Sequence, residues 1–262
     1  MGWNLLAIVF AVCMAACCVG FIKYVYFMSI GYGFAIALGA IAMAVIFRGS
    51  LAAVTIVQLA LFVLYGIRLS GFLALRELKN AAYKKTLAEV TKTEKPLPVF
   101  VLIAMWIFMG VLYTMQLSPV FYRLYNGAFD VVCPLVGIVI SACGVLLEAE
   151  ADRQKSAQKT ANPKMVATQG LYKLVRCPNY LGEITFWTGV FVGSWTALRS
   201  PLQWVFAVLA YILIILIMFN GAQRLEKRQN ASYGDKPEYQ AYVKKTPILL
   251  PFVPLYSLNK KK

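Results

Sequence analysis

The residues best suited to chemistry lie in one short stretch, which reads GLYKLVRCPNYLGEITFW from Gly170 onward. Arg176, Asn179, Tyr180 and Glu183 occur there at the start of a strongly apolar segment. Ionisable side chains beside a membrane interior are costly and are usually functional. The combination predicts either a site that binds a polyanionic ligand or orients a reacting group, or an interfacial anchor in which Arg176 snorkels and Tyr180 joins the aromatic belt.

A second set of polar residues precedes that stretch, in LLEAEADRQKSAQK. Glu148, Asp152 and Lys155 follow one another at spacings of four and three, so they share one face of a helix that continues the fifth apolar run, and Lys159 extends the row. Such a row can hold the ribose hydroxyls and phosphates of a nucleotide. It is equally compatible with a solvated helix end carrying charge pairs.

A third set follows the last apolar run. Arg224 and Arg228 begin it, and Tyr239 and Tyr242 precede the apolar sequence TPILLPF. Basic residues are expected at a cytoplasmic helix end from topology alone. The tyrosines and the return to apolar residues add a prediction, namely a tail that folds back against the membrane face and covers a ligand.

A fourth set lies inside the third apolar run. Gln58, Leu61, Tyr65 and Arg68 are spaced by three, four and three residues and therefore form one helical stripe. A guanidinium at that depth costs at least a few kcal/mol unless it is paired or faces a wet cavity. The stripe predicts either a buried cavity with hydrogen-bond donors for a carbonyl oxygen or a polar clamp between helices.

The composition places all four sets in a membrane protein. The chain has 262 residues, 60% of them hydrophobic, and a mean hydropathy of +0.68, which excludes an ordinary soluble domain. Apolar runs of spanning length occur at residues 2–22, 30–47, 51–75, 98–117, 131–149, 180–198 and 201–220. We therefore predict an all-α polytopic protein with seven transmembrane helices in a single membrane domain, 1–262, whose first run is a retained helix. The Lys-rich segment between Arg76 and Pro98 is expected to be a partly helical cytoplasmic connector.

Basic residues predict the orientation of these helices. With the N-terminus outside, 22 of the 26 Lys and Arg residues lie in inner segments and three in outer loops, so the positive-inside rule places the C-terminus in the cytoplasm. The net charge of +15 then reflects topology and contact with anionic membrane lipids. Nucleic acid is not expected as a partner.

Histidine is absent, and the six cysteines lack the spacing of a zinc site. The sequence therefore predicts no metal, and acid–base chemistry has to use other side chains or water. It also contains neither a GxGxxG element after a strand nor a P-loop. A nucleotide would have to bind at a site embedded in the helical bundle.

From about Leu147 to Phe252 the chain resembles the steroid 5-alpha-reductase family, including its bacterial DUF1295 branch. The resemblance is carried by LLEAEADRQK, by GLYKLVRCPNYLGEITFW with its N-x-L-G-E-I-x-x-W core, and by EKRQNASYGDKPEYQAYVKKTPILLPF. The family has seven transmembrane helices and uses NADPH to reduce the carbon–carbon double bond of 3-oxo-Δ4 steroids. The resemblance thus implies residues 1–117 on the substrate side and 118–262 on the cofactor side, with a steroid or related lipid enone entering from the bilayer.

The resemblance also implies roles for individual residues. The expected cofactor contacts are Glu148, Asp152, Lys155, Lys159, Tyr172, Arg176, Asn179, Tyr180, Glu183, Arg224, Arg228, Tyr239 and Tyr242. Tyr65 matches a family tyrosine that hydrogen-bonds the steroid carbonyl, with hydride passing to C5, and Gln58, Arg68 and Tyr32 complete the expected catalytic set.

Two positions depart from the family pattern. Cys177 stands where many bacterial relatives have histidine, and no acidic residue precedes Glu77, whereas the animal enzymes carry a Gln-Glu pair in the second span. Ser29, Tyr32 or Gln58 are the available substitutes for that pair.

Two other functions fit the same residues. One is an isoprenylcysteine-type membrane methyltransferase using S-adenosylmethionine, because its C-terminal motif also reads R-x-P-x-Y. The other is a non-catalytic sterol-binding membrane protein. The motif is typical of bacteria, so the inner membrane is the expected location, with the cofactor site facing the cytoplasm.

Overall fold

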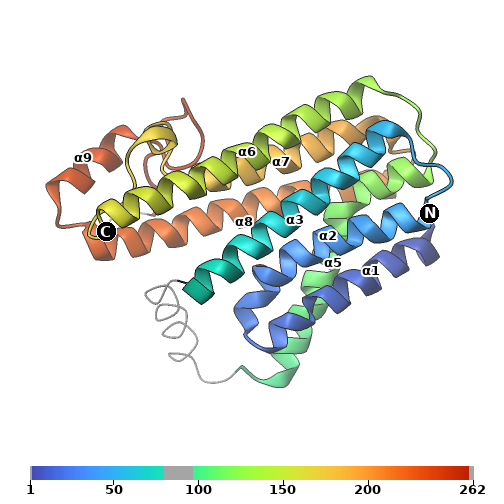
Figure 1. The fold of residues 1–262 in the computed structure, drawn as a ribbon, viewed down its shortest axis with the longest axis horizontal. Helices are drawn as coiled ribbons and strands as arrows, with labels where there is room; N and C mark the ends of the chain where they lie inside the picture. Colours follow the sequence, from blue (N-terminus) through green and yellow to red (C-terminus); the bar gives the residue numbers. More distant parts are fainter. Residues whose placement is uncertain (1, 80–96, 260–262) are drawn as a thin grey trace. The chain divides into compact units, whose positions relative to one another are not determined.

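The computed structural model describes residues 2–79 and 97–259, and this part of the chain is helical without a β-strand (Figure 1). The prediction of an all-α protein is confirmed. Most of the predicted connector between Arg76 and Pro98 lies outside the described residues. The α-helices are α1 (Trp3–Cys17), α2 (Ile30–Ile46), α3 (Ala53–Lys79), α5 (Val99–Tyr125), α6 (Val132–Ala161), α7 (Pro178–Ser194), α8 (Pro201–Tyr233) and α9 (Pro237–Lys245).

Each of the seven apolar runs contains a helix, because a continuous apolar segment can bury its backbone only by satisfying its own hydrogen bonds. Five helical segments of the described chain are long and apolar enough to cross a membrane: Trp3–Phe21, Ala53–Leu78, Val99–Tyr125, Val132–Ala161 and Pro201–Tyr233. α2 and α7 are shorter, with 17 residues each. The crossing of all seven helices and their orientation therefore stay predictions.

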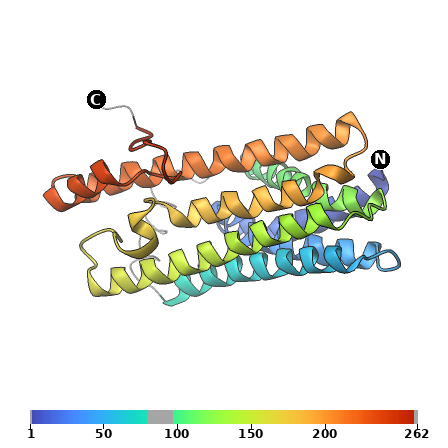
Figure 2. The ribbon, with the colours of Figure 1, turned by 90° about the horizontal axis from the view of Figure 1, so that it is seen from above.

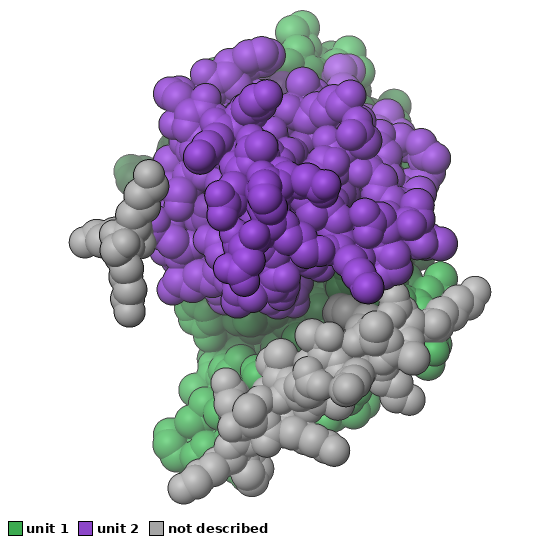
Figure 3. Space-filling model, turned by 90° about the vertical axis from the view of Figure 1, so that its left-hand side faces the viewer, with its two compact units in different colours: residues 1–138, 193–210 green, residues 139–192, 211–262 purple. Residues whose placement is uncertain are grey.

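The chain divides into two compact units, coloured separately in Figure 3. Unit 1 contains residues 1–138 and 193–210, and unit 2 contains residues 139–192 and 211–262. Both α6 and α8 contribute residues to both units.

In unit 1, α1, α2, α3 and α5 pack side by side (Figures 1 and 2). α2 and α3 approach most closely at Gly33 and Gly66, where a Cβ on Gly66 would lie 2.2 Å from the carbonyl oxygen of Gly33. Only glycine permits backbones to come this near. Because Tyr32 and Tyr65 immediately precede these glycines, the crossing brings the two tyrosines together.

In unit 2, α6, α7 and the second part of α8 run alongside one another, with α9 and the C-terminal tail at one end (Figure 2). Glycines again set the α6–α7 contact: a Cβ on Gly144 would lie 2.4 Å from the backbone nitrogen of Phe186. The Ser141 hydroxyl donates to the Phe186 carbonyl at 3.1 Å in the same crossing. The row of charged residues on α6 is thereby held against the start of α7.

Candidate functional site

Tyr65 lies in a cluster of three buried tyrosines in unit 1. It is 0% exposed, Tyr32 is 7% exposed and Tyr113 is 3% exposed. The Tyr32 ring stacks on Tyr113 with centroids 4.9 Å apart and meets the Tyr65 ring edge-on at 6.0 Å. Tyr113 is fixed by donating its hydroxyl proton to the Phe27 carbonyl at 2.7 Å. The cluster is therefore a rigid set of phenols in an apolar bundle.

The predicted stripe on α3 faces inward. Gln58 and Tyr65 are buried and Arg68 is half-buried, whereas Leu64 and Ile67, on the opposite face, are exposed. The Gln58 Nε2 atom is buried without a hydrogen-bond partner among the described residues. An unsatisfied buried amide is costly; the contact of Gln58 with a ligand stays a prediction.

Gly182 brings the N-x-L-G-E motif of α7 against the acidic row of α6. A Cβ on Gly182 would lie 2.6 Å from Cγ of Glu148 and 2.9 Å from its backbone nitrogen. Both Glu148 and Glu183 are buried, and Glu183 accepts a hydrogen bond from Trp187 Nε1 at 3.1 Å. Glycine at this position thus permits the close approach of α7 to α6 at Glu148.

Tyr172 and Tyr242 connect the turn at Gly170–Lys173 to α6 and α9. The Tyr172 hydroxyl donates to the Ala151 carbonyl at 3.2 Å, and the Tyr242 hydroxyl donates to the Tyr172 carbonyl at 2.7 Å. Burial raises the pKa of both phenols. They therefore remain neutral donors at physiological pH, and both hydroxyls are engaged by backbone carbonyls.

Arg176 forms a buried ion pair with Glu226 of α8. Its Nη2 lies 2.9 Å from the Glu226 Oε1 atom and also donates to the Tyr256 carbonyl. The second oxygen of Glu226 accepts from the Leu258 backbone nitrogen at 2.9 Å and from Asn259 Nδ2 at 2.7 Å. The pair therefore ties the C-terminal tail to α7 and α8.

The tail also joins the motif through its backbone. The nitrogens of Arg176 and Cys177 donate to the carbonyls of Pro247 and Ile248, at 2.9 and 3.0 Å. Ile248 and Leu249 pack with Cys177 and Ala222 in one buried cluster. The tail thus folds back onto α7 and α8, as the sequence predicted; whether it covers a ligand stays a prediction.

The charged row and the motif meet around Cys177. Burial raises the pKa of its thiol to about 12, although the positive charges of Lys155 and Arg176 oppose the rise. The Cys177 thiol is therefore within electrostatic range of Lys155 on α6. Lys159 lies further along α6 and donates to the Pro163 carbonyl at 2.6 Å, the Met165 carbonyl at 2.9 Å and the Tyr233 hydroxyl at 3.1 Å.

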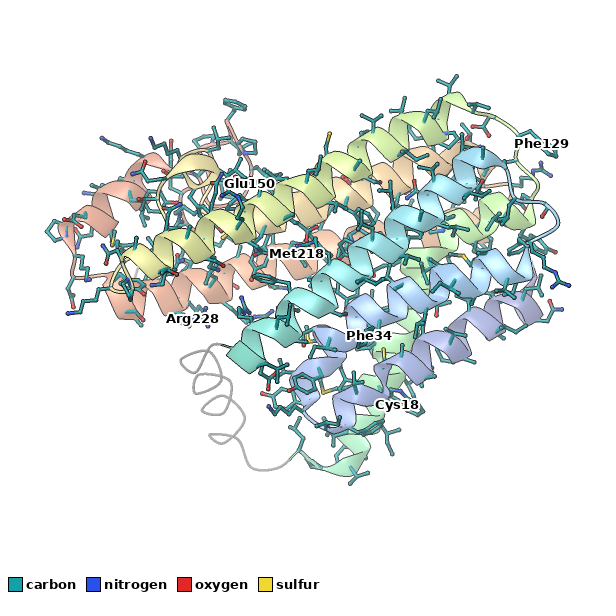
Figure 4. All side chains as sticks on the ribbon, viewed as in Figure 1. Cys18, Phe34, Phe129, Glu150, Met218 and Arg228 are labelled. Atoms are coloured by element: carbon teal, nitrogen blue, oxygen red, sulfur yellow. The ribbon has the colours of Figure 1, made fainter. Side chains whose placement is uncertain are left out.

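The remaining predicted contacts differ in exposure. Asp152, Asn179 and Tyr180 are half-buried, and Tyr239 is buried with its hydroxyl donating to Asn230 Oδ1 at 2.7 Å. Arg224 and Arg228 are exposed on α8, where Figure 4 labels Arg228. The contact of each with a cofactor stays a prediction.

The donor set in unit 2 is chemically suited to a phosphorylated dinucleotide. Lys155 and Arg176 offer cations for phosphate, and Glu148 and Asp152 offer carboxylates for ribose hydroxyls. Two nitrogens of Arg176, Nε and Nη1, are buried without a hydrogen-bond partner among residues 2–79 and 97–259. Within the same residues, no group of three or more Cys, Asp or Glu side chains is placed to hold a metal ion.

Two residues of these sites are not among the predicted ones. Glu226 is one of them, although it is a lone acid among Arg224, Lys227 and Arg228. Tyr113 was not singled out because it lies in an otherwise apolar run. The repeated Tyr-Gly pairs at 32–33 and 65–66 were the available signal for the tyrosine cluster.

Comparison with known proteins identifies a family and one relative. A family described as "Protein of unknown function (DUF1295)" matches residues 22–246. A bovine protein (Bos taurus) named "3-oxo-5-alpha-steroid 4-dehydrogenase 1" is 26% identical over 167 residues, which cover 61% of this chain and 58% of that protein. The chain thus matches less than two thirds of the length of this relative. No solved structure matches the chain.

Proposed function

The chain belongs to the DUF1295 family, which is steroid 5-alpha-reductase-like, and from that premise we propose that it is a membrane oxidoreductase that uses NADPH to reduce a carbon–carbon double bond conjugated to a carbonyl. The proposed substrate is a 3-oxo-Δ4 steroid or a related lipid enone. The single observation that carries the proposal is the similarity to the bovine 3-oxo-5-alpha-steroid 4-dehydrogenase.

Tyr65 is the proposed donor to the substrate carbonyl. Hydride addition at C5 of a 3-oxo-Δ4 system moves negative charge onto the carbonyl oxygen at C3, and a donor that is already oriented stabilises that charge without reorganisation. The complete burial of Tyr65 and the packing of its ring against Tyr32 support this role. Gln58 and Arg68, on the same stripe of α3, are proposed to complete the polar lining.

Unit 2 is the proposed cofactor side. When bound, NADPH supplies the hydride. Lys155 and Arg176 are proposed to hold phosphate, Glu148 and Asp152 to hold ribose hydroxyls, and Asn179 to orient the cofactor beside them. Lys159, Tyr172, Tyr180, Glu183, Arg224, Arg228, Tyr239 and Tyr242 are proposed as further contacts or as supports for these residues.

The proposed placement is an integral membrane protein with its cofactor side facing the cytoplasm of a bacterial inner membrane. Its five long apolar helices and the strong bias of basic residues toward one side support this placement. The N-terminus would then lie outside, and lipid enones would reach the protein from the bilayer.

One assay tests the proposed function. Purified protein is incubated with NADPH and testosterone or progesterone, and the product is analysed by mass spectrometry. A gain of two hydrogens with stoichiometric loss of NADPH is expected. Deuteride from 4-deuterated NADPH should appear at C5, which separates enzymatic reduction from reduction by solvent species.

Ligand-induced thermal shifts provide the control. NADPH should raise the unfolding temperature, whereas S-adenosylmethionine should not, because the proposal contains no methyl transfer. A shift with S-adenosylmethionine alone would overturn the proposal in favour of a methyltransferase. Sterol binding without NADPH consumption would leave a binding protein instead.

A further inference from the structure

Phe252, in the tail of unit 2, combines a strained backbone with an exposed ring. Its φ of 64° is the one positive value found at a non-glycine residue in the described ranges. The side chain is 96% exposed. The left-handed conformation is unfavourable for a residue with a Cβ, and exposing a phenyl ring to water is also unfavourable. Both costs indicate that the ring contacts something outside the chain.

The loop that carries Phe252 is held firmly. Pro251 and Pro254 flank its tip, and the Ile248 nitrogen donates to the Leu255 carbonyl at 2.8 Å across the loop base. The Leu255 nitrogen in turn donates to the Val253 carbonyl at 2.7 Å. The backbone therefore fixes Phe252 outward instead of letting it collapse onto unit 2.

The loop lies level with the end of the apolar part of α8. Ile212 and Leu216 are exposed apolar residues one helical turn apart, as expected for a lipid-facing surface. The tail packs on Ala222, six residues beyond Leu216, which is a rise of about 9 Å. The loop base therefore meets α8 just beyond the exposed apolar residues of that helix.

The chemistry around the loop suits an anionic lipid headgroup. A hollow of about 270 Å³ lies between the loop and the turn that precedes α7. It is lined by apolar side chains, by the phenol of Tyr256 and by the ammonium of Lys173. Lys244 and Lys245 are exposed at the nearby end of α9. A protruding ring beside cations is the pattern of segments that bind the bilayer interface.

We propose that the loop Pro251–Pro254 inserts into the headgroup layer of an anionic leaflet, with Phe252 at the acyl boundary and Lys173 facing lipid phosphate. This role is independent of the proposed reductase activity. Interfacial apolar groups of this kind bury about 5–10 Å into the headgroup and acyl boundary. The loop is then a lateral contact of the protein with lipid, additional to its spanning helices.

Spin labels in nanodiscs test the proposal directly. A label is attached at Phe252→Cys in full-length protein in which Cys18, Cys133 and Cys143 are replaced by serine. Collision rates of the label are then measured with oxygen, which concentrates in lipid, and with a water-soluble nickel chelate.

We expect a several-fold higher ratio of oxygen to nickel collisions at position 252 than at the control Gln240→Cys, an exposed residue of α9. Val253→Cys gives a second reading if the first variant does not fold.

Lipid composition supplies the charge arm of the experiment. Adding phosphatidylglycerol to phosphatidylcholine nanodiscs should increase the immersion of the label at position 252, and Lys173→Gln should remove that increase. Equal collision ratios at positions 252 and 240 would overturn the proposal. Protection of the label from the nickel chelate that depends on protein concentration, with dipolar broadening between labels, would also overturn the proposal. The loop would then contact a second copy of the chain.

Discussion

Nη2 of Arg176 lies 2.9 Å from Oε1 of Glu226, and each side chain exposes only 1% of its surface. A buried pair of this kind is weak evidence of net stabilisation, because desolvation offsets much of the attraction. Removing one partner, however, leaves an uncompensated buried charge. The pair is therefore a sensitive point at which to test how the tail is held.

Glu226→Gln should destabilise the protein by about 3–5 kcal/mol. The substitution leaves the Arg176 guanidinium buried without its counter-ion, and it weakens the contacts to Leu258 and Asn259. Thermal unfolding in detergent measures the effect. Lys227→Gln, an exposed neighbour on the same helix, is the matched control and should change little. Similar unfolding temperatures for the two variants would show that the pair does not anchor the tail.

Gly182→Ala should separate α6 from α7. Its Cβ would lie 2.9 Å from both the Glu148 nitrogen and the Gly144 carbonyl oxygen, so the backbone has to move, at a cost of about 1–3 kcal/mol. The proposed function predicts that this substitution also lowers the affinity for NADPH, which equilibrium titration measures. Gly71→Ala on α3 is the control, because nothing lies within 4 Å of the added Cβ, and it should stabilise its helix by about 0.5–1 kcal/mol.

Tyr65→Phe should lower turnover of the steroid by a factor of about 10²–10³, since one donor to a developing oxyanion contributes about 2.7–4 kcal/mol. The fold should persist because the ring and its packing remain. Tyr113→Phe is the comparison variant: it loses the bond to the Phe27 carbonyl and should lower stability more than turnover. A parental rate for Tyr65→Phe would remove this residue from the proposed chemistry.

Cys177 should be almost inert to alkylation at neutral pH. Burial raises the pKa of its thiol to about 12, so the reactive thiolate is scarce below that pH. The labelling rate of a free thiol, with a pKa of about 8.5, levels off above that pH. The labelling rate of Cys177 should still increase with pH there. Peptide-resolved maleimide labelling measures this. Glu226→Gln should accelerate labelling of Cys177 by loosening the tail that covers it. Rapid labelling of the parent protein near pH 7 would contradict the burial of this thiol.

The seven helices from α1 to α8 were predictable because each is encoded by a local property, a continuous apolar run, whereas the polar helix α9 has no such run. Their ends were not: α8 continues to Tyr233 although its apolar run ends at residue 220. Nothing local stops it there, since Gln223, Arg224 and Leu225 all favour a helix. Spacing alone predicted a continued helix that aligns Glu148, Asp152 and Lys155. α6 confirms that the helix continues through them.

The site was less predictable because its key contacts join distant residues. Glu226 pairs with Arg176, which is 50 positions away. An isolated acidic residue in a basic run suggests that it has a partner, but the sequence does not identify which residue that partner is. The Tyr32–Tyr65 contact depends on two glycines in different helices, and its importance emerges only when the helices cross. The roles of Asp152, Asn179 and Arg224 toward a cofactor remain predictions for the experiments above.

The return of residues 247–259 to Arg176 and Glu226 has a consequence for biogenesis. During synthesis, α7 and α8 leave the ribosome before the segment that holds Tyr256, Leu258 and Asn259, which make three hydrogen bonds to the Arg176–Glu226 pair. Until that segment arrives, two charged groups face an incomplete interior, so the part of unit 2 around Arg176 and Glu226 matures only after these late residues have emerged. A ribosome stalled before residue 247 should therefore hold a nascent chain whose membrane helices are inserted but whose Cys177 is still open to alkylation.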